Sequence, residues 1–122
     1  MVGAFPRRGD IHWVELNPVV GAEMGKTRPA LVVQNDIGNE FSGTTIIVTI
    51  SSQHSAQPYP FLVPLPDGTL SKPSVANCAH VRTVDRSRLA SGAIARLDAD
   101  TMRAVDDALR VSLGLATGTD RD

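Results

Sequence analysis

The sequence predicts a mainly β domain, a small barrel-like sheet, with one α-helix packed on it at the C-terminal end. Two patterns support this fold class. Up to about residue 90, short apolar stretches alternate with turn-forming residues, which is typical of several short strands. From Asp98 onward, apolar residues recur at helical spacing instead. With 122 residues, the chain has the length of one domain, so we expect a single domain over residues 1–116 and a frayed tail over 117–122.

Six stretches of the chain predict β-strands. Each is short and apolar, and residues that favour turns separate them. The stretch TTIIVTI, residues 44–50, is the richest in β-branched side chains. Pro29 is compatible with the start of a central strand, because proline is tolerated at the first strand position. The predicted strands are residues 10–16, 30–34, 44–50, 61–65, 74–84 and 88–90.

The segments between these strands are predicted to be loops and turns. Residues 17–27 (NPVVGAEMGKT) form an exposed, glycine-bearing loop, and residues 51–60 form a polar one. Residues 35–43 carry turn residues throughout, and Pro66-Asp67-Gly68 is a turn signal.

The C-terminal helix has an apolar stripe that we expect to contact the core. Asp98 or Asp100 can cap its first turn, and Gly114 can end it. The stripe consists of Met102, Val105, Leu109 and Leu113.

Charge and composition narrow the function classes. Twelve basic residues oppose thirteen acidic ones, so the net charge does not indicate a nucleic-acid binder. Basic residues nevertheless gather in two segments, which permits a local basic groove. They are Arg7, Arg8, Lys26 and Arg28, followed by Arg82, Arg86 and Arg88.

A disulfide, a metal site and a membrane anchor are not expected. Cys78 is the single cysteine and is predicted to be buried, and three scattered histidines do not have metal-ligand spacing. We therefore expect no metal and no cofactor. The N-terminus lacks an apolar signal core and no apolar run approaches membrane-spanning length, so a cytoplasmic protein is expected.

Arg28 and Ser51 are the leading candidates for chemistry. Each is expected at a strand end beside a loop, where functional groups usually sit on a rigid scaffold. An arginine and a hydroxyl that converge on one phosphate suit phosphodiester chemistry, because the transition state gathers negative charge. The alternative is a surface ion pair at Arg28 and local turn bonding at Ser51.

Other constellations are less specific. His54 and His80 could act as acid and base near neutral pH, although nothing in the sequence indicates that they meet. A Ser-His-Asp set from Ser51 or Ser74 with His80 and Asp85 lacks the nucleophile-elbow glycines. Trp13 and Phe61 are expected in the core, and either could stack on a base if exposed.

The order of the motifs resembles the MazF/PemK family of toxin endoribonucleases over nearly the whole chain. Residues 9–23 follow GDIxWVxLxPxxGxE, residues 28–36 read RPALVVQND, and residues 80–89 match the QxRTxD...RL segment with His80 in place of glutamine. The C-terminal helix, with VDDAL at 105–109, continues the resemblance.

This resemblance implies a homodimer of SH3-like barrels of the CcdB/PemK type. It implies metal-independent cleavage of single-stranded RNA at short sequences, in a groove across the dimer, to 2′,3′-cyclic phosphate and 5′-hydroxyl ends. It also implies a cognate antitoxin whose disordered C-terminal segment covers that groove.

Within the family, this chain resembles the branch that uses an arginine, here Arg28, and a threonine, here replaced by Ser51. The positions of the other branch's histidine, arginine and aspartate hold Ala22, Asn77 and Ala79. Because arginine stays protonated near neutral pH, we expect Arg28 to clamp the phosphorane and not to act as a base. Candidate substrate contacts are Arg8, Glu23, Lys26, Ser52, Gln53, His80, Arg82 and Arg88.

Two other functions fit the same resemblance. A gyrase-poisoning toxin of the CcdB type shares the barrel and acts by binding a protein. A catalytically silent RNA-binding module would result if serine cannot replace threonine at position 51. Arg28 and the segment at 80–89 favour the ribonuclease.

Overall fold

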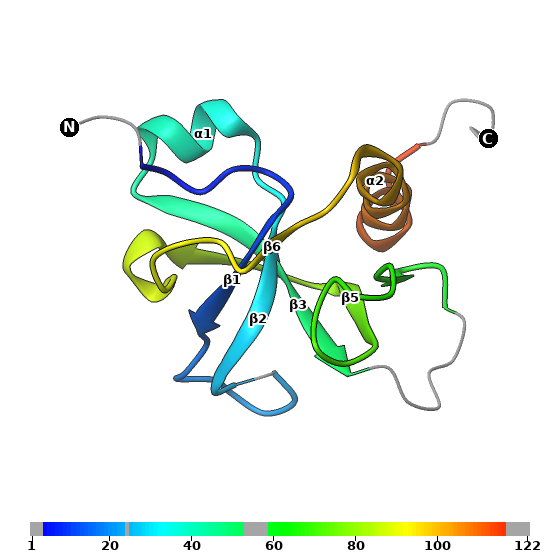
Figure 1. Ribbon diagram of the computed structural model, residues 1–122, viewed down its shortest axis with the longest axis horizontal. Helices are drawn as coiled ribbons and strands as arrows, with labels where there is room; N and C mark the ends of the chain where they lie inside the picture. Colours follow the sequence, from blue (N-terminus) through cyan, green and yellow to red (C-terminus); the bar gives the residue numbers. More distant parts are fainter. Residues whose placement is uncertain (1–3, 24, 53–58, 117–122) are drawn as a thin grey trace.

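A computed structural model describes residues 4–23, 25–52 and 59–116 of the chain. Within them, six strands form one antiparallel sheet in the order β4-β5-β3-β2-β1-β6, and two α-helices flank it (Figure 1). The elements are β1 (Asp10–Glu15), β2 (Thr27–Val32), α1 (Asp36–Phe41), β3 (Thr44–Ser52), β4 (Leu62–Pro64), β5 (Ser74–Asp85), β6 (Ala95–Arg96) and α2 (Ala99–Leu113), with a 3₁₀ turn at Arg86–Arg88. The predicted mainly β class with a C-terminal helix is confirmed.

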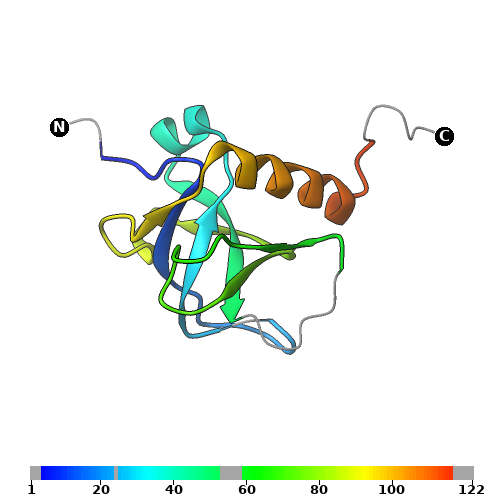
Figure 2. The ribbon, with the colours of Figure 1, turned by 45° about the vertical axis from the view of Figure 1, so that its right-hand side comes forward.

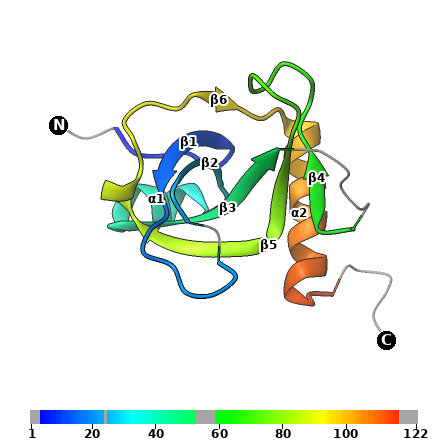
Figure 3. The same ribbon diagram turned by 90° about the horizontal axis from the view of Figure 1, so that it is seen from below.

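The sheet curls into an open half-barrel around the long strands β3 and β5 (Figure 3). These two strands pair along their whole lengths, from Thr44 with Asp85 to Ser52 with Ser74. The pairing shifts once, because Val48 faces Val81 whereas the next residue, Thr49, faces Asn77. Residues 78–80 therefore form a bulge in β5, and a bulge bends its strand and redirects side chains.

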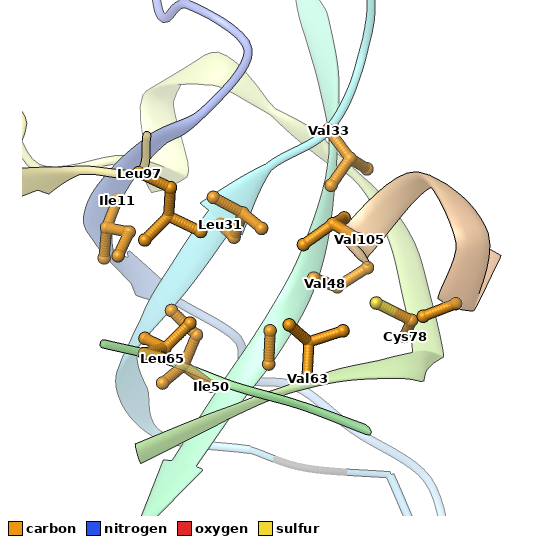
Figure 4. Close-up of a cluster of buried hydrophobic side chains, with 12 residues drawn as sticks. Ile11, Leu31, Val33, Val48, Ile50, Val63, Leu65, Cys78, Leu97 and Val105 are labelled. Carbon is orange, nitrogen blue, oxygen red and sulfur yellow. The ribbon is translucent and has the colours of Figure 1, made fainter. Parts of the chain in front are cut away.

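Apolar side chains fill both faces of the sheet, which explains why the RPALVV stretch is apolar without alternation. In β2, Leu31 points to one face, while Ala30 and Val32 point to the other. The first cluster lies between the sheet and α2, where Val105 of the helix meets the strands (Figure 4). The second cluster is smaller and consists of Val14, Leu16, Ala30, Val32, Ile47 and Val84.

Helix α2 begins and ends where its capping residues predict. Asp98 caps it, since its Oδ1 accepts a hydrogen bond from the Thr101 amide at 2.9 Å. The hydrogen bonds to Thr101 lower the pKa of the Asp98 carboxyl below its usual value. Gly114 ends the helix in the left-handed conformation, φ 71°, which suits glycine. The helix lies against β4 and β5 (Figure 2). Among the described residues, no helix is long and apolar enough to cross a membrane.

The structure differs from the sequence prediction between β2 and β3. Residues 35–43, expected to be turns, contain α1. Asn35 caps this helix by accepting from the Gly38 amide at 2.7 Å. Asn39, inside the helix, is fully buried and accepts from the Thr45 hydroxyl at 2.6 Å. Asn35 and Asn39, whose residue type favours turns, therefore act here as a helix cap and as a buried hydrogen-bond partner.

Residues 88–90 were also predicted wrongly as a strand. Arg88 instead ends a 3₁₀ turn that begins at Arg86, where Asp85 accepts from the Ser87 amide at 2.8 Å and turns the chain. Leu89 makes a single bridge to Val14. The short strand β6 was not predicted, since it is only two residues long.

Candidate active site

A cleft of about 690 Å³ opens beside the ends of β2 and β3. One side is formed by β1 and β2, and the other by the loop that leads into β5. Arg28 and Ser51, the two leading candidates, both line it. The remaining lining residues are Trp13, Pro29, Ile50, Ser52, Gly68, Thr69, Leu70, Ser71, Lys72, Ser74 and Ile94.

The ladder between β2 and β3 explains why Arg28 and Ser51 share this cleft. Ala30 pairs with Thr49 at the end of the ladder. Arg28 and Ser51 each lie two residues beyond this pair along their strands, toward the cleft that both line. Both side chains are half-buried, so each is held by its strand while part of it stays accessible.

One hydrogen bond within the chain orients the Arg28 guanidinium. Its Nε donates to the Gly25 carbonyl at 2.9 Å. Its two terminal nitrogens have no hydrogen-bond partner among residues 4–23, 25–52 and 59–116. Those terminal donors are the pair with which an arginine grips two oxygens of one phosphate.

The loop before Arg28 is closed by the side chain of Asn17. Its Oδ1 accepts from the Lys26 amide at 3.0 Å, and the Leu16 amide donates to the Lys26 carbonyl at 2.9 Å. A Cβ on Gly25 would lie 2.4 Å from Asn17 Oδ1, so only glycine fits beside this closure. Asn17 and Gly25 together thus fix the carbonyl that orients Arg28.

Arg82 and Arg88 hold the other end of this loop. Arg82 Nη1 donates to the Leu16 carbonyl at 2.5 Å. Arg88 Nη1 donates to the carbonyls of Glu15 at 3.0 Å and Asn17 at 2.5 Å. These arginines come from β5 and the 3₁₀ turn, far along the sequence from the loop, so residues 15–17 and residues 82–88 meet at one place.

A second, smaller pocket of about 230 Å³ adjoins the loop. It contains Glu23 from the loop and His80 from the β5 bulge, with Thr49 and Arg82. His80 is exposed, and its Nδ1 lies 3.3 Å from the Thr49 hydroxyl. The bulge therefore turns His80 toward the loop that also carries Glu23.

The other candidates for substrate contact are placed differently. Lys26 is exposed at the loop end with φ 67°, and Ser52 is exposed at the end of β3. Arg8 lies outside both pockets. Its Nε donates to the Val33 carbonyl at 2.8 Å, and its Nη2 pairs with Asp106 at 2.6 Å, joining β2 to α2. Gln53 and His54 lie outside the described residues.

Two aromatic residues were expected in the core, and Trp13 is not there. Its side chain is 45% exposed and lines the cleft. Side chains two positions apart in a strand share a face, so Trp13 lies on the same face of β1 as the fully buried Ile11, at a place where that face is not covered. Phe61 is partly buried against the first core cluster, as expected, and stacks on Tyr59 with ring centroids 5.2 Å apart.

Cys78 is fully buried, as predicted. Burial raises the pKa of its thiol to about 11, so it stays protonated and packs as a small apolar residue. Among the described residues, no group of three histidine, cysteine or acidic side chains could hold a metal ion.

Sequence comparison identifies the protein family of this chain. Residues 7–113 match the family of the PemK-like, MazF-like toxins of type II toxin-antitoxin systems. The chain is also 41% identical over 111 residues to Endoribonuclease EndoA of Bacillus subtilis strain 168. The aligned residues cover 89% of this chain and 95% of that protein.

Solved structures give the same result. The MazF of Deinococcus radiodurans is 31% identical, with a TM-score of 0.78 over 91% of this chain and 98% of that one. MazF in a MazE-MazF structure from the same organism is 32% identical, with a TM-score of 0.72 over the same shares. The half-barrel with its C-terminal helix is therefore the fold of the MazF toxins. The chain belongs to the PemK-like, MazF-like toxin family.

Proposed function

We propose that this protein is an endoribonuclease toxin that cleaves single-stranded RNA at short specific sequences without a metal ion. The observation that supports it best is the shared cleft of Arg28 and Ser51 on adjacent strands. The curated relative that is 41% identical carries the name endoribonuclease. The chain acts in the cytoplasm, where RNA is available to it.

The reaction is an attack of the RNA on its own backbone. The 2′-oxygen of one nucleotide forms a bond to the adjacent phosphorus, and the bond from phosphorus to the 5′-oxygen breaks. A proton leaves the 2′-hydroxyl and one is gained by the 5′-oxygen, so the products are a 2′,3′-cyclic phosphate and a 5′-hydroxyl. The pentavalent intermediate gathers negative charge on its oxygens, and fixed donors stabilise that charge.

Arg28 and Ser51 supply such donors. Arg28 is oriented through Nε by the Gly25 carbonyl, which directs its terminal nitrogens as a fork toward the phosphorane. The Ser51 hydroxyl is the neutral donor that the family's threonine would supply. Arginine remains protonated near neutral pH, so Arg28 acts as a clamp on charge and as a donor toward the departing 5′-oxygen.

The second pocket extends the binding surface beyond the reacting phosphate. Glu23 and His80 present hydrogen-bonding groups to bases, and Lys26 and Ser52 lie exposed beside the two strand ends. Glu23 is itself held in place, because its Oε1 accepts from the Val20 amide at 2.6 Å. Arg82 and Arg88 contribute indirectly, because they bond to the start of the loop that carries Glu23 and Lys26.

Two protein partners are inferred, an antitoxin from the family and a second copy of the chain from the exposed apolar residues. The family belongs to toxin-antitoxin systems, and we infer a cognate antitoxin whose disordered C-terminal segment covers the RNA groove. We also infer a homodimer, because apolar side chains remain exposed at the end of α2 and a two-fold contact would cover them. They are Val111, Leu113 and Leu115.

Incubation of the purified protein with a long single-stranded RNA in EDTA tests the proposal. The expected result is a limited set of fragments whose 3′ ends are cyclic phosphates and whose 5′ ends are hydroxyls, mapped by end-specific sequencing. Intact RNA would contradict it. Inhibition of gyrase in that case would identify a CcdB-type toxin, and RNA binding without cleavage would identify a silent binding module.

A further inference from the structure

We propose that the Trp13 side of the cleft is a subsite for one nucleobase that flanks the reacting phosphate. This inference rests on the proposed RNA cleavage and adds a place for a base to the residues that contact the phosphate. It concerns a part of the cleft that neither Arg28 nor Ser51 occupies.

The first observation is an exposed aromatic side chain in the middle of a strand. Trp13 is 45% exposed, whereas Ile11 and Val14 beside it in β1 are fully buried. In the β1–β2 ladder, Trp13 pairs with Pro29. The indole and the proline ring therefore stand side by side on the strand position adjacent to Arg28.

The second observation is that the segment 90–94 is tied to β1 at Trp13 and at Ile11. The Ala90 amide donates to the Trp13 carbonyl at 2.8 Å, and the Ile94 amide donates to the Ile11 carbonyl at 2.8 Å. Ile94 is 41% exposed and lines the same cleft. Trp13, Pro29 and Ile94 therefore form a fixed apolar surface.

The opposite side of the cleft is polar and carries a positive charge. It is the loop 68–72, which includes Thr69 and the exposed Lys72. The Thr69 hydroxyl and amide both bond to the Pro66 carbonyl, at 2.7 and 3.1 Å, which shapes this loop as a tight turn. Lys72 offers a cation to a phosphate on the far side of the base.

These features together select a nucleotide over other occupants. A base has a flat face that stacks on an aromatic ring whatever its identity. The phosphates on its two sides carry the charges that Arg28 and Lys72 complement. An aliphatic side chain of a protein partner would use the indole but would leave both cations unmatched. The volume of about 690 Å³ is also in the range of sites that enclose small ligands.

The tryptophan itself reports on this subsite, because it is the single tryptophan of the chain. The probe is a short 2′-O-methyl RNA, which binds but lacks the hydroxyl needed for cleavage. The control probe is an abasic oligomer, which has the same number of phosphates but no bases. We expect the base-bearing probe to quench the fluorescence and the abasic probe to leave it nearly unchanged at the same occupancy, which is measured by anisotropy of a labelled end.

Two variants complete the experiment. Trp13→Leu should bind the 2′-O-methyl RNA about 5- to 100-fold more weakly, the range expected for one stacked base, whereas Trp13→Phe should stay within a few-fold of wild type. Phe41→Leu is the matched control, because Phe41 is 79% exposed on α1, away from the cleft. Thermal melting checks that each variant is folded.

The outcomes separate this inference from the proposed function. Equal affinity of Trp13→Leu and Phe41→Leu, or equal quenching by the abasic probe, would overturn the subsite even if the wild type cleaves RNA. Base-dependent quenching by a protein that leaves RNA intact would support the subsite and contradict the cleavage. Absence of binding by both probes would overturn the subsite, and intact RNA in the cleavage assay would overturn the proposed function.

Discussion

At the scale of single residues, we expect Arg28 and Ser51 to differ in how much each contributes to the cleavage rate. Arg28 has a fixed orientation, because Nε is bonded to the Gly25 carbonyl, and it brings a full charge. Ser51 brings a neutral hydroxyl at the corresponding position of β3. A charge-assisted contact to the phosphorane is stronger than a neutral one, so the two residues differ in the size of their expected effects.

Arg28→Ala should lower the cleavage rate by about 10²–10³, as for other lost donors to a developing oxyanion. Arg28→Lys should recover little, because a single ammonium cannot replace the planar fork. Ser51→Ala should have a smaller effect, and Ser51→Thr should retain activity. Single-turnover cleavage of one labelled RNA measures all four. Near wild-type cleavage by Arg28→Ala would show that the site assignment is wrong.

Asp36 offers a test of stability against pH. Its carboxylate accepts from the Arg8 amide at 2.7 Å and from Asn39 at 3.1 Å, and the bond from Arg8 is the main cause that lowers its pKa. A lowered folded-state pKa means that the charged form stabilises the fold above the unfolded value of about 3.9, and that this contribution is lost as the pH falls toward the folded value.

Asp36→Asn should therefore reduce the urea midpoint at pH 7, and the difference from wild type should shrink below about pH 3.5. Urea titrations followed by circular dichroism at several pH values measure this. Asp67→Asn, in the exposed turn after β4, is the control and should not show a pH-dependent difference. A difference for Asp36→Asn that is constant with pH would contradict the role of its charge.

At the scale of elements, the loop between β1 and β2 depends on partners from the distant end of β5. Arg82 and Arg88 bond to the carbonyls of residues 15–17, and Asn17 in turn closes the loop through the Lys26 amide. A small displacement of this loop would move Glu23 and the Gly25 carbonyl together, and small misplacements at a reacting centre can be costly.

Arg88→Ala should lower kcat/KM by about 10- to 100-fold through the position of the loop. The logarithmic salt dependence of RNA binding should stay unchanged, whereas loss of a direct phosphate contact reduces the slope by about 0.7 for a single strand. Arg88→Lys should recover part of the activity, since an ammonium can still donate to a carbonyl. Arg86→Ala is the control, because Arg86 bonds to the Ser42 and Ala4 carbonyls instead. A reduced salt slope in Arg88→Ala would identify it as a phosphate contact.

Elements with a strong local pattern were predictable from the sequence. The run at 44–50 is a strand because its β-branched side chains favour strands and most of them are buried in the sheet. Helix α2 was predicted from its apolar stripe and from the capping residues at its two ends. Helix α1 was missed because Asn35 and Asn39 act through contacts with Gly38 and Thr45 that a turn-like composition does not reveal.

The candidate site was predictable only in part. Arg28 and Ser51 were found through their positions at strand ends, and the structure brings them to one cleft. The exposure of Trp13 depends on which face of β1 is left open at that point, and residue type alone favours burial. The hydrogen bonds of Arg8, Arg82 and Arg88 connect residues 25 to 98 positions apart, a range that no local pattern reports.

At the scale of the whole molecule, the exposed apolar residues are unevenly distributed. Val111, Leu113 and Leu115 follow closely in sequence at the end of α2 and are each about half exposed, although Leu113 was predicted to contact the core. Helix α1 carries a separate pair, Ile37 and Phe41, at another place on the molecule (Figure 1). We expect the α2 group to belong to the inferred two-fold contact, since it is the larger of the two.

The double variant Val111→Glu with Leu115→Glu should therefore sediment as a monomer at micromolar concentration, where the wild type should sediment as a dimer. Buried charges would oppose the contact. The double variant Ile37→Glu with Phe41→Glu, which introduces the same two charges on α1, should leave the dimer intact. Sedimentation velocity compares the three proteins. A dimer that survives the double change would place the interface elsewhere.

The bulge at residues 78–80 has a consequence for how this protein can diversify. Cys78 is buried in the core, whereas Ala79 and His80 are exposed and stand outside the β3–β5 pairing. Substitutions at these two positions change the pocket near Glu23 without disturbing a paired strand. We therefore expect a library randomised at positions 79 and 80 to return mostly folded proteins whose preference for RNA sequence differs from that of the wild type.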